Sequence, residues 1–162
     1  MEEVSISLVV GIFITLLLSA FFSGMEIAFV SSNRMLAEMD KGSSKLTRRL
    51  QTFFYKNPND FVSTMLVGNN IVLVVYGIFV ARLLDNTIFK GLDPAISVTA
   101  DTILSTLVVL FTGEFLPKTL FKSNPNKFFS FFVFPAYLFY LLLWPVSRFS
   151  TLLSKILLKI SG

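Results

Sequence analysis

Three groups of oxygen-bearing residues interrupt the apolar runs of this 162-residue chain. In the first run, Ser19, Ser23 and Glu26 follow i, i+4, i+7 spacing, so all three project from one face of a helix. The other two groups are Gly68-Asn69-Asn70 and Gly113-Glu114-Phe115-Leu116-Pro117-Lys118. Polar groups inside an apolar helix are costly unless they meet partners, water or an ion. Together the three groups suggest a cation site within a membrane.

The composition narrows the chemistry of such a site. The sequence has no Cys and no His, which excludes disulfides, imidazole ligands and Ser-His catalytic pairs. The remaining ligands are carboxylate, hydroxyl, amide and carbonyl oxygens, which suit hard cations. This ligand set does not separate Mg²⁺ from Na⁺. We expect no enzyme activity, because the chain offers no nucleophile–base pair.

The third group contains the clearest candidate ligand, Glu114, which could instead have a purely structural role. Glu114 can supply negative charge to a cation, or it can pair with Lys118 four residues later. Pro117 has no backbone N–H, so it frees a carbonyl about one turn earlier, beside Gly113. A freed carbonyl is a cation ligand in the broken helices of transporters.

The other candidates also have local alternatives. Asn69 and Asn70 lie about 100° apart on a helix, so both cannot face one site equally. One intramembrane Asn is often an interhelical hydrogen-bonding group. Ser19 and Ser23 can bond to carbonyls of their own helix, and Glu26 can pair with a nearby cytoplasmic Lys or Arg.

These residues require membrane-spanning elements to position them. The chain is 54% hydrophobic and 15% charged, with a mean hydropathy of +0.73, which indicates an all-α integral membrane protein. Runs at 4–30, 61–81 and 95–117 are each long enough to cross ~30 Å of hydrocarbon. The connector at 31–58 is expected to form two short cytoplasmic helices, at 34–40 and 45–55. The net charge of +4 does not indicate nucleic-acid binding, because the basic residues flank apolar segments.

The distribution of Lys and Arg predicts the orientation. Basic residues are concentrated in 31–58 and after residue 117, which should therefore be cytoplasmic. The connector at 82–94 should be outside, with Asp101 near the outer mouth of the third span, where it attracts cations or terminates the helix favourably. The N-terminus is then outside and the C-terminus cytoplasmic, in a bacterial cytoplasmic membrane.

A fourth apolar run, 128–147, is ambiguous. It contains Pro135 and Pro145, and its rings favour the headgroup level of a bilayer. We interpret 126–160 as a kinked juxtamembrane helix in the cytoplasmic interface; an ordinary fourth span is the alternative. The tail continues as an amphipathic pattern. The aromatic residues of the run are Phe128, Phe129, Phe131, Phe132, Phe134, Tyr137, Phe139, Tyr140 and Trp144.

The three groups, in this order, resemble the transmembrane domain of the CorC/cyclin-M magnesium transporters. The motifs are Phe22-Ser23-Gly24-Met25-Glu26-Ile27-Ala28, Val67-Gly68-Asn69-Asn70 and Gly113-Glu114-Phe115-Leu116-Pro117-Lys118. The resemblance covers nearly the whole chain as one transmembrane domain. It implies three transmembrane helices, a juxtamembrane helix, a homodimer and Mg²⁺ export with Na⁺ as coupling ion. Cytoplasmic CBS-type domains of the family are absent from this sequence.

The resemblance also assigns residue roles. It implies metal ligands at Ser23, Gly68, Asn69 and Glu114, with Ser19 as a weaker addition. Gating or supporting roles fall to the remaining motif positions, Gly24, Glu26, Asn70, Gly113, Pro117 and Lys118. An alternative function is a cation-binding membrane anchor or sensor that regulates magnesium homeostasis without transporting the ion.

Overall fold

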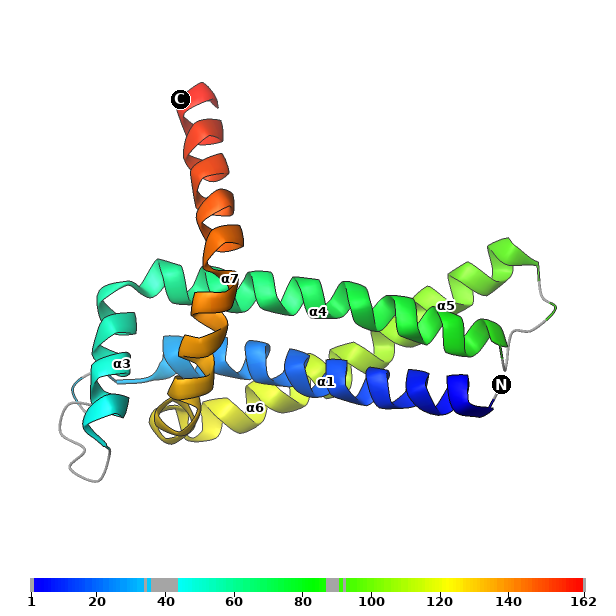
Figure 1. Cartoon of the computed structure of the whole chain (residues 1–162), viewed down its shortest axis with the longest axis horizontal. Helices are drawn as coiled ribbons and strands as arrows, with labels where there is room; N and C mark the ends of the chain where they lie inside the picture. The colour runs from blue at the N-terminus through cyan, green and yellow to red at the C-terminus, as the bar shows by residue number, and fades with distance from the viewer. Residues whose placement is uncertain (1, 34, 36–43, 87–90, 92, 162) are drawn as a thin grey trace. The chain divides into compact units, whose positions relative to one another are not determined.

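The computed structural model describes residues 2–33, 35, 44–86, 91 and 93–161 (Figure 1). Every regular element within these residues is a helix. In chain order the elements are α1 (Glu2–Ser31), α3 (Lys45–Lys56), α4 (Pro58–Asn86), α5 (Pro94–Val109), the π-helix η1 (Leu110–Phe115), α6 (Leu116–Ser123) and α7 (Pro125–Ser161).

Local sequence signals define where these helices begin. Ser44 caps α3 by accepting a hydrogen bond from the Thr47 N–H at 3.1 Å. Asp93 caps α5 through the Ala95 N–H at 3.2 Å, and proline occupies the next position. Proline also begins α4 and α7, where its missing N–H has no intrahelical partner to lose.

The helices contain the predicted spans with some differences. The runs at 4–30 and 61–81 are the cores of α1 and α4, and the predicted short helix at 45–55 is α3. The run at 95–117 is not one regular α-helix, because a π-helical turn at η1 separates α5 from α6. The helix expected at 34–40 lies outside the described residues, apart from Met35.

Four helical segments of the described chain are long and apolar enough to cross a membrane: Ser5–Ser31, Pro58–Asp85, Pro94–Ser123 and Pro125–Ser161. The protein is thus an integral membrane protein of helical architecture. The expectation of three spans with an interfacial fourth segment is not confirmed.

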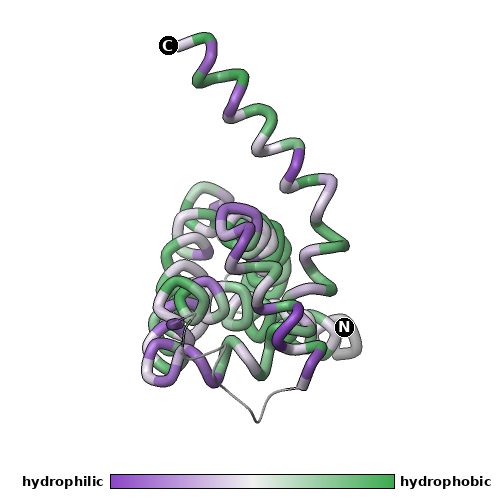
Figure 2. Tube along the Cα trace, turned by 90° about the vertical axis from the view of Figure 1, so that its left-hand side faces the viewer, coloured by the Kyte–Doolittle hydropathy of each residue, from purple (hydrophilic) through white to green (hydrophobic). Residues whose placement is uncertain are grey.

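The prolines of α7 do not divide it into separate helices. Pro135 and Pro145 both lie inside one continuous helix of 37 residues. Each lacks the N–H that would bond the carbonyl four residues earlier, but the rest of the hydrogen-bonding ladder holds the helix. Figure 2 shows that its C-terminal part alternates between hydrophilic and hydrophobic residues, as the amphipathic pattern predicts.

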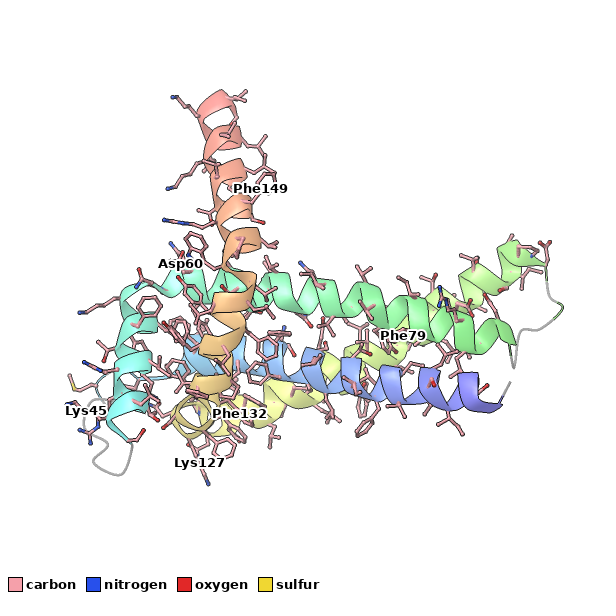
Figure 3. All side chains as sticks on the ribbon, viewed as in Figure 1. Lys45, Asp60, Phe79, Lys127, Phe132 and Phe149 are labelled. Atoms are coloured by element: carbon pink, nitrogen blue, oxygen red, sulfur yellow. The ribbon has the colours of Figure 1, made fainter. Side chains whose placement is uncertain are left out.

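The chain forms two compact units. The first comprises residues 1–24 and 69–120, and the second comprises 25–68 and 121–162. In the first unit α4 and α5 run antiparallel, with the Tyr76 hydroxyl donating to the Ser105 carbonyl at 3.0 Å. α1 closely approaches α4, because a Cβ added at Gly11 would lie 2.8 Å from the ring of Phe79 (Figure 3).

The second unit has an aromatic core. Phe54, Phe61 and Phe129 are completely buried, and the ring of Phe29 lies 4.5 Å from that of Phe61 and 5.4 Å from that of Phe129. The tilted and edge-on ring arrangements are those that aromatic pairs favour. This core joins α3 and α7 to the C-terminal end of α1 and the first turns of α4.

The core changes the interpretation of the aromatic run in α7. Phe129 and Tyr140 pack inside the unit and are not free to form an interfacial belt. Phe131, at 76% exposure, and Trp144, at 44%, remain on the surface, as does Phe134. Phe149, labelled in Figure 3, is also exposed. Hydropathy alone does not distinguish these two environments, because protein core and lipid are both apolar.

A pair of hydrogen bonds connects the end of α1 to the start of α7 within the second unit. The Asn126 side chain donates to the Asn33 carbonyl at 2.8 Å and accepts from the Asn33 N–H at 3.0 Å. The Asn33 side chain in turn accepts from the Met35 N–H at 2.9 Å. One amide thus satisfies both backbone groups of a residue just beyond a helix end.

Candidate functional site

A buried hydrogen bond joins α1 to α4 in the first unit. The Ser19 hydroxyl donates to the Asn69 Oδ1 at 2.7 Å. Ser19 is fully buried and Asn69 is 8% exposed, whereas Asn70 is exposed. Asn69 therefore faces the protein interior and Asn70 does not. Successive helical residues point ~100° apart, so the two adjacent amides cannot both face the same site.

A second buried hydrogen bond joins α1 to η1. Ser23, which is 1% exposed, donates to the Gly113 carbonyl at 2.6 Å and also lies 2.9 Å from the carbonyl of Ser19. In a regular α-helix the Gly113 carbonyl would accept from the residue at position 117. Since Pro117 has no N–H, this carbonyl is available to the Ser23 hydroxyl.

The π-helical turn places this carbonyl against α1. The Leu116 N–H bonds to the Phe111 carbonyl, five residues earlier, which is the π-helical pattern. Gly113 is buried, and a Cβ added there would lie 3.0 Å from both Ser19 Oγ and Val109 Cγ2. The absence of a side chain at Gly113 thus lets α1 and η1 approach each other closely.

Four oxygen-bearing positions from three helices are therefore gathered: Ser19, Ser23, Asn69 and Gly113. We call them the oxygen group. Their hydrogen bonds satisfy one another, but each acceptor oxygen has two lone pairs and uses only part of that capacity. The group can hold a hard cation if its hydrogen bonds rearrange, with neutral oxygens supplying most ligands.

Glu114 is next to the oxygen group in sequence, but its side chain is not hydrogen-bonded to it. Glu114 lines an open cavity of about 320 Å³ together with Tyr76, Ser105 and other, mainly apolar residues of α4, α5 and η1. Glu114 is partly exposed, and within the described residues no ion pair joins it to Lys118, which is exposed. Direct ligation by Glu114 would require its side chain to turn toward Ser23 and Asn69.

The remaining motif positions lie around these elements. Gly24 in α1 and Pro117 in α6 are buried, and Glu26 is partly buried two residues beyond Gly24. Gly68 is buried directly before Asn69 in α4. Within the described residues no three His, Cys, Asp or Glu side chains form a metal-binding group, so a cation at the oxygen group would be held mainly by neutral oxygens.

Sequence reasoning missed Tyr76. Its hydroxyl donates to the Ser105 carbonyl, and its side chain forms part of the wall of the Glu114 cavity. Tyr76 follows Asn69 by seven residues, which places both on the same face of α4. That spacing is the signal that would have identified it.

Comparisons with known proteins agree with the family resemblance. The family model of the cyclin M transmembrane N-terminal domain matches residues 10–162. The chain is 28% identical over 155 residues to the UPF0053 protein MG146 homolog of Mycoplasma pneumoniae, covering 90% of this chain and 35% of that protein.

Two other relatives are more than 30% identical to this chain. The UPF0053 inner membrane protein YfjD of Escherichia coli is 32% identical over 111 residues, covering 68% of this chain and 24% of that protein. A UPF0053 protein of Haemophilus influenzae is 31% identical over 166 residues, covering 96% of this chain and 37% of that protein. The chain thus spans only about a quarter to somewhat more than a third of the length of these relatives.

Proposed function

The chain belongs to the cyclin M transmembrane family, as its motifs indicated, and we propose that it binds Mg²⁺ within the membrane and exports it, with Na⁺ as the coupling ion. The observation that carries this proposal is the oxygen group, in which buried oxygens from α1, α4 and η1 meet within one compact unit. Buried polar groups in membrane helices are rare and typically functional.

In this proposal Ser19, Ser23, Asn69 and backbone carbonyls near Gly68 and Gly113 replace part of the hydration shell of the ion. Mg²⁺ gives up its water reluctantly and usually retains some of it, so a site of mainly neutral oxygens suits a partly hydrated ion. Glu114 supplies the negative charge, either directly after its side chain turns or through a metal-bound water.

The proposed transport cycle uses breaks in regular helical structure. The chain passes from one compact unit to the other at Gly24 in α1 and at Gly68 in α4, immediately beside the oxygen group in sequence. A π-helical turn lies in the third span, and such turns often mark functional hinges. Movement at these positions would expose the ion alternately to the two sides of the membrane.

We further propose a homodimer with the N-terminus outside and the C-terminus cytoplasmic. In this arrangement α7 lies at the cytoplasmic interface, since Arg148, Lys155 and Lys159 would otherwise be outside, against the positive-inside bias. The exposed apolar face of its C-terminal half, with Leu152, Leu153 and Ile156, suits an interfacial position.

Mg²⁺ flux from proteoliposomes tests the proposal. S23A removes the donor to the Gly113 carbonyl, and we expect flux to fall at least tenfold. The matched control is T112V, which removes a hydroxyl from η1, the helical turn that contains Gly113. The Thr112 hydroxyl bonds within its own helical segment, to the Val108 carbonyl at 2.7 Å. Equal flux from S23A and the parent protein would contradict the proposal.

A membrane anchor or sensor is the second candidate function. It is favoured by the fact that the oxygen group satisfies its own hydrogen bonds, as a purely structural contact would. A sensor would show saturable Mg²⁺ binding at the oxygen group, lost in S23A, without flux from the parent protein. Flux that saturates with Mg²⁺ and depends on Ser23 excludes this alternative.

A further inference from the structure

A second polar cluster lies in the first unit, where the end of α4 meets the start of α5. The Ser97 hydroxyl donates to Asp85 Oδ1 at 2.7 Å. Asp101 follows Ser97 by four residues and thus lies on the same face of α5. Its carboxyl group neighbours that of Asp85.

Asp101 is unusual because it is buried with an oxygen that lacks a partner. The residue is 6% exposed, and its Oδ1 accepts no hydrogen bond. Within the described residues, no Lys or Arg forms an ion pair with Asp85 or Asp101; Arg82, one turn before Asp85, is exposed. A buried carboxylate oxygen without a donor is destabilising unless something absent from the protein chain satisfies it.

Electrostatics point to a positively charged ligand. Two neighbouring carboxylates repel each other when both are ionised, and this repulsion weighs most on the buried Asp101, because Asp85 is exposed to solvent. Asp85 also lies in the last turn of α4, where the helix dipole disfavours a negative charge. The hydroxyl of Ser97 adds a third oxygen beside the two carboxyl groups.

We propose that Asp85, Ser97 and Asp101 form a second cation site, which takes a hydrated divalent cation. Two carboxylates and a hydroxyl match the hard-oxygen preference and the charge of such an ion, and the remaining ligands are water. The site is separate from the oxygen group, since Asp85 follows Asn69 by sixteen residues of α4, or about 24 Å of helix. The proposal does not depend on transport.

Mn²⁺ binding, measured by electron paramagnetic resonance on the full purified chain, tests the proposal. All variants carry N69A, which disables the oxygen group so that only the second site is counted. We expect N69A alone to bind one Mn²⁺ per chain. N69A/D101N should weaken that binding at least tenfold, and so should N69A/D85N, which retains the buried Asp101.

N69A/D93N is the matched control. Asp93 is an exposed acid at the start of α5, and Asn caps helices as well as Asp does, so its neutralisation should leave Mn²⁺ binding unchanged. The proposal is overturned if N69A binds no Mn²⁺, or if D101N and D85N bind it as tightly as D93N does. Thermal stabilisation by D101N without any Mn²⁺ binding would instead indicate two carboxyls that share a proton.

Discussion

At the scale of single residues, the close approach of α1 and η1 depends on Gly113. A methyl group at this position would lie 3.0 Å from Ser19 Oγ and Val109 Cγ2, so both must shift. We expect G113A to lower the free energy of unfolding by about 1–3 kcal/mol, as overpacking typically does. Thermal unfolding of the purified protein in detergent measures this effect.

Gly77 provides the control for that experiment. It lies in α4 of the same unit, and a Cβ added there meets no atom within 4 Å. G77A should therefore keep or slightly raise the melting temperature, because Ala favours the helix more than Gly does. Equal melting temperatures for G113A and G77A would show that the contact between Gly113 and Ser19 does not limit packing.

Asn126 supports a second prediction at this scale. N126A removes both hydrogen bonds to the Asn33 backbone, so the Asn33 N–H and carbonyl must bond to other partners. We expect a loss of about 1–2 kcal/mol in unfolding free energy. K127A, a neighbouring change on the exposed surface, should stay within about 0.5 kcal/mol of the parent protein. If both variants melt alike, the Asn33–Asn126 pair is not a stabilising contact.

At the scale of helical elements, the π-helical turn connects local sequence to the candidate site. P117A restores an N–H that can bond the Gly113 carbonyl in the α-helical pattern, in competition with the Ser23 hydroxyl. We expect P117A to raise the melting temperature and to slow Mg²⁺ flux several-fold, because a more regular third span moves less readily.

P145A is the comparison for P117A. Pro145 also lies inside a helix, but in α7, which contributes nothing to the oxygen group. P145A should therefore gain stability from the loss of a proline, as P117A does, but its Mg²⁺ flux should stay unchanged. The hinge interpretation fails if both variants alter flux to the same extent.

The element scale also shows what sequence alone determines. The length of the apolar runs predicted most helices, and Pro117 pointed to a freed carbonyl beside Gly113. The choice of Asn69 over Asn70, and the direction of the Glu114 side chain, depend on how helices rotate against each other. Similarly, Phe129 and Phe131 have the same hydropathy, yet one is in the core and the other is exposed.

At the scale of the whole molecule, the position of α7 relative to the membrane decides the topology. The chain has no native Cys, so single cysteines can be labelled without background. We expect D93C to react with a membrane-impermeant maleimide in intact cells, and S44C and S154C to react only after permeabilisation. Labelling of S154C in intact cells would instead show that α7 crosses the bilayer.

The central claim is that the oxygen group binds Mg²⁺, and the most direct measurement is thermal unfolding of the N69A and N70A variants with increasing Mg²⁺. A ligand at 100 times its Kd stabilises the folded state by about 2.7 kcal/mol. Asn69 belongs to the oxygen group, whereas the adjacent Asn70 is exposed. N70A is therefore the control, because it makes the same substitution outside the oxygen group. We predict that, when all three proteins also carry D101N to remove the second cation site, Mg²⁺ raises the melting temperature of the parent protein and N70A but not of N69A. An equal rise in all three proteins would contradict the claim.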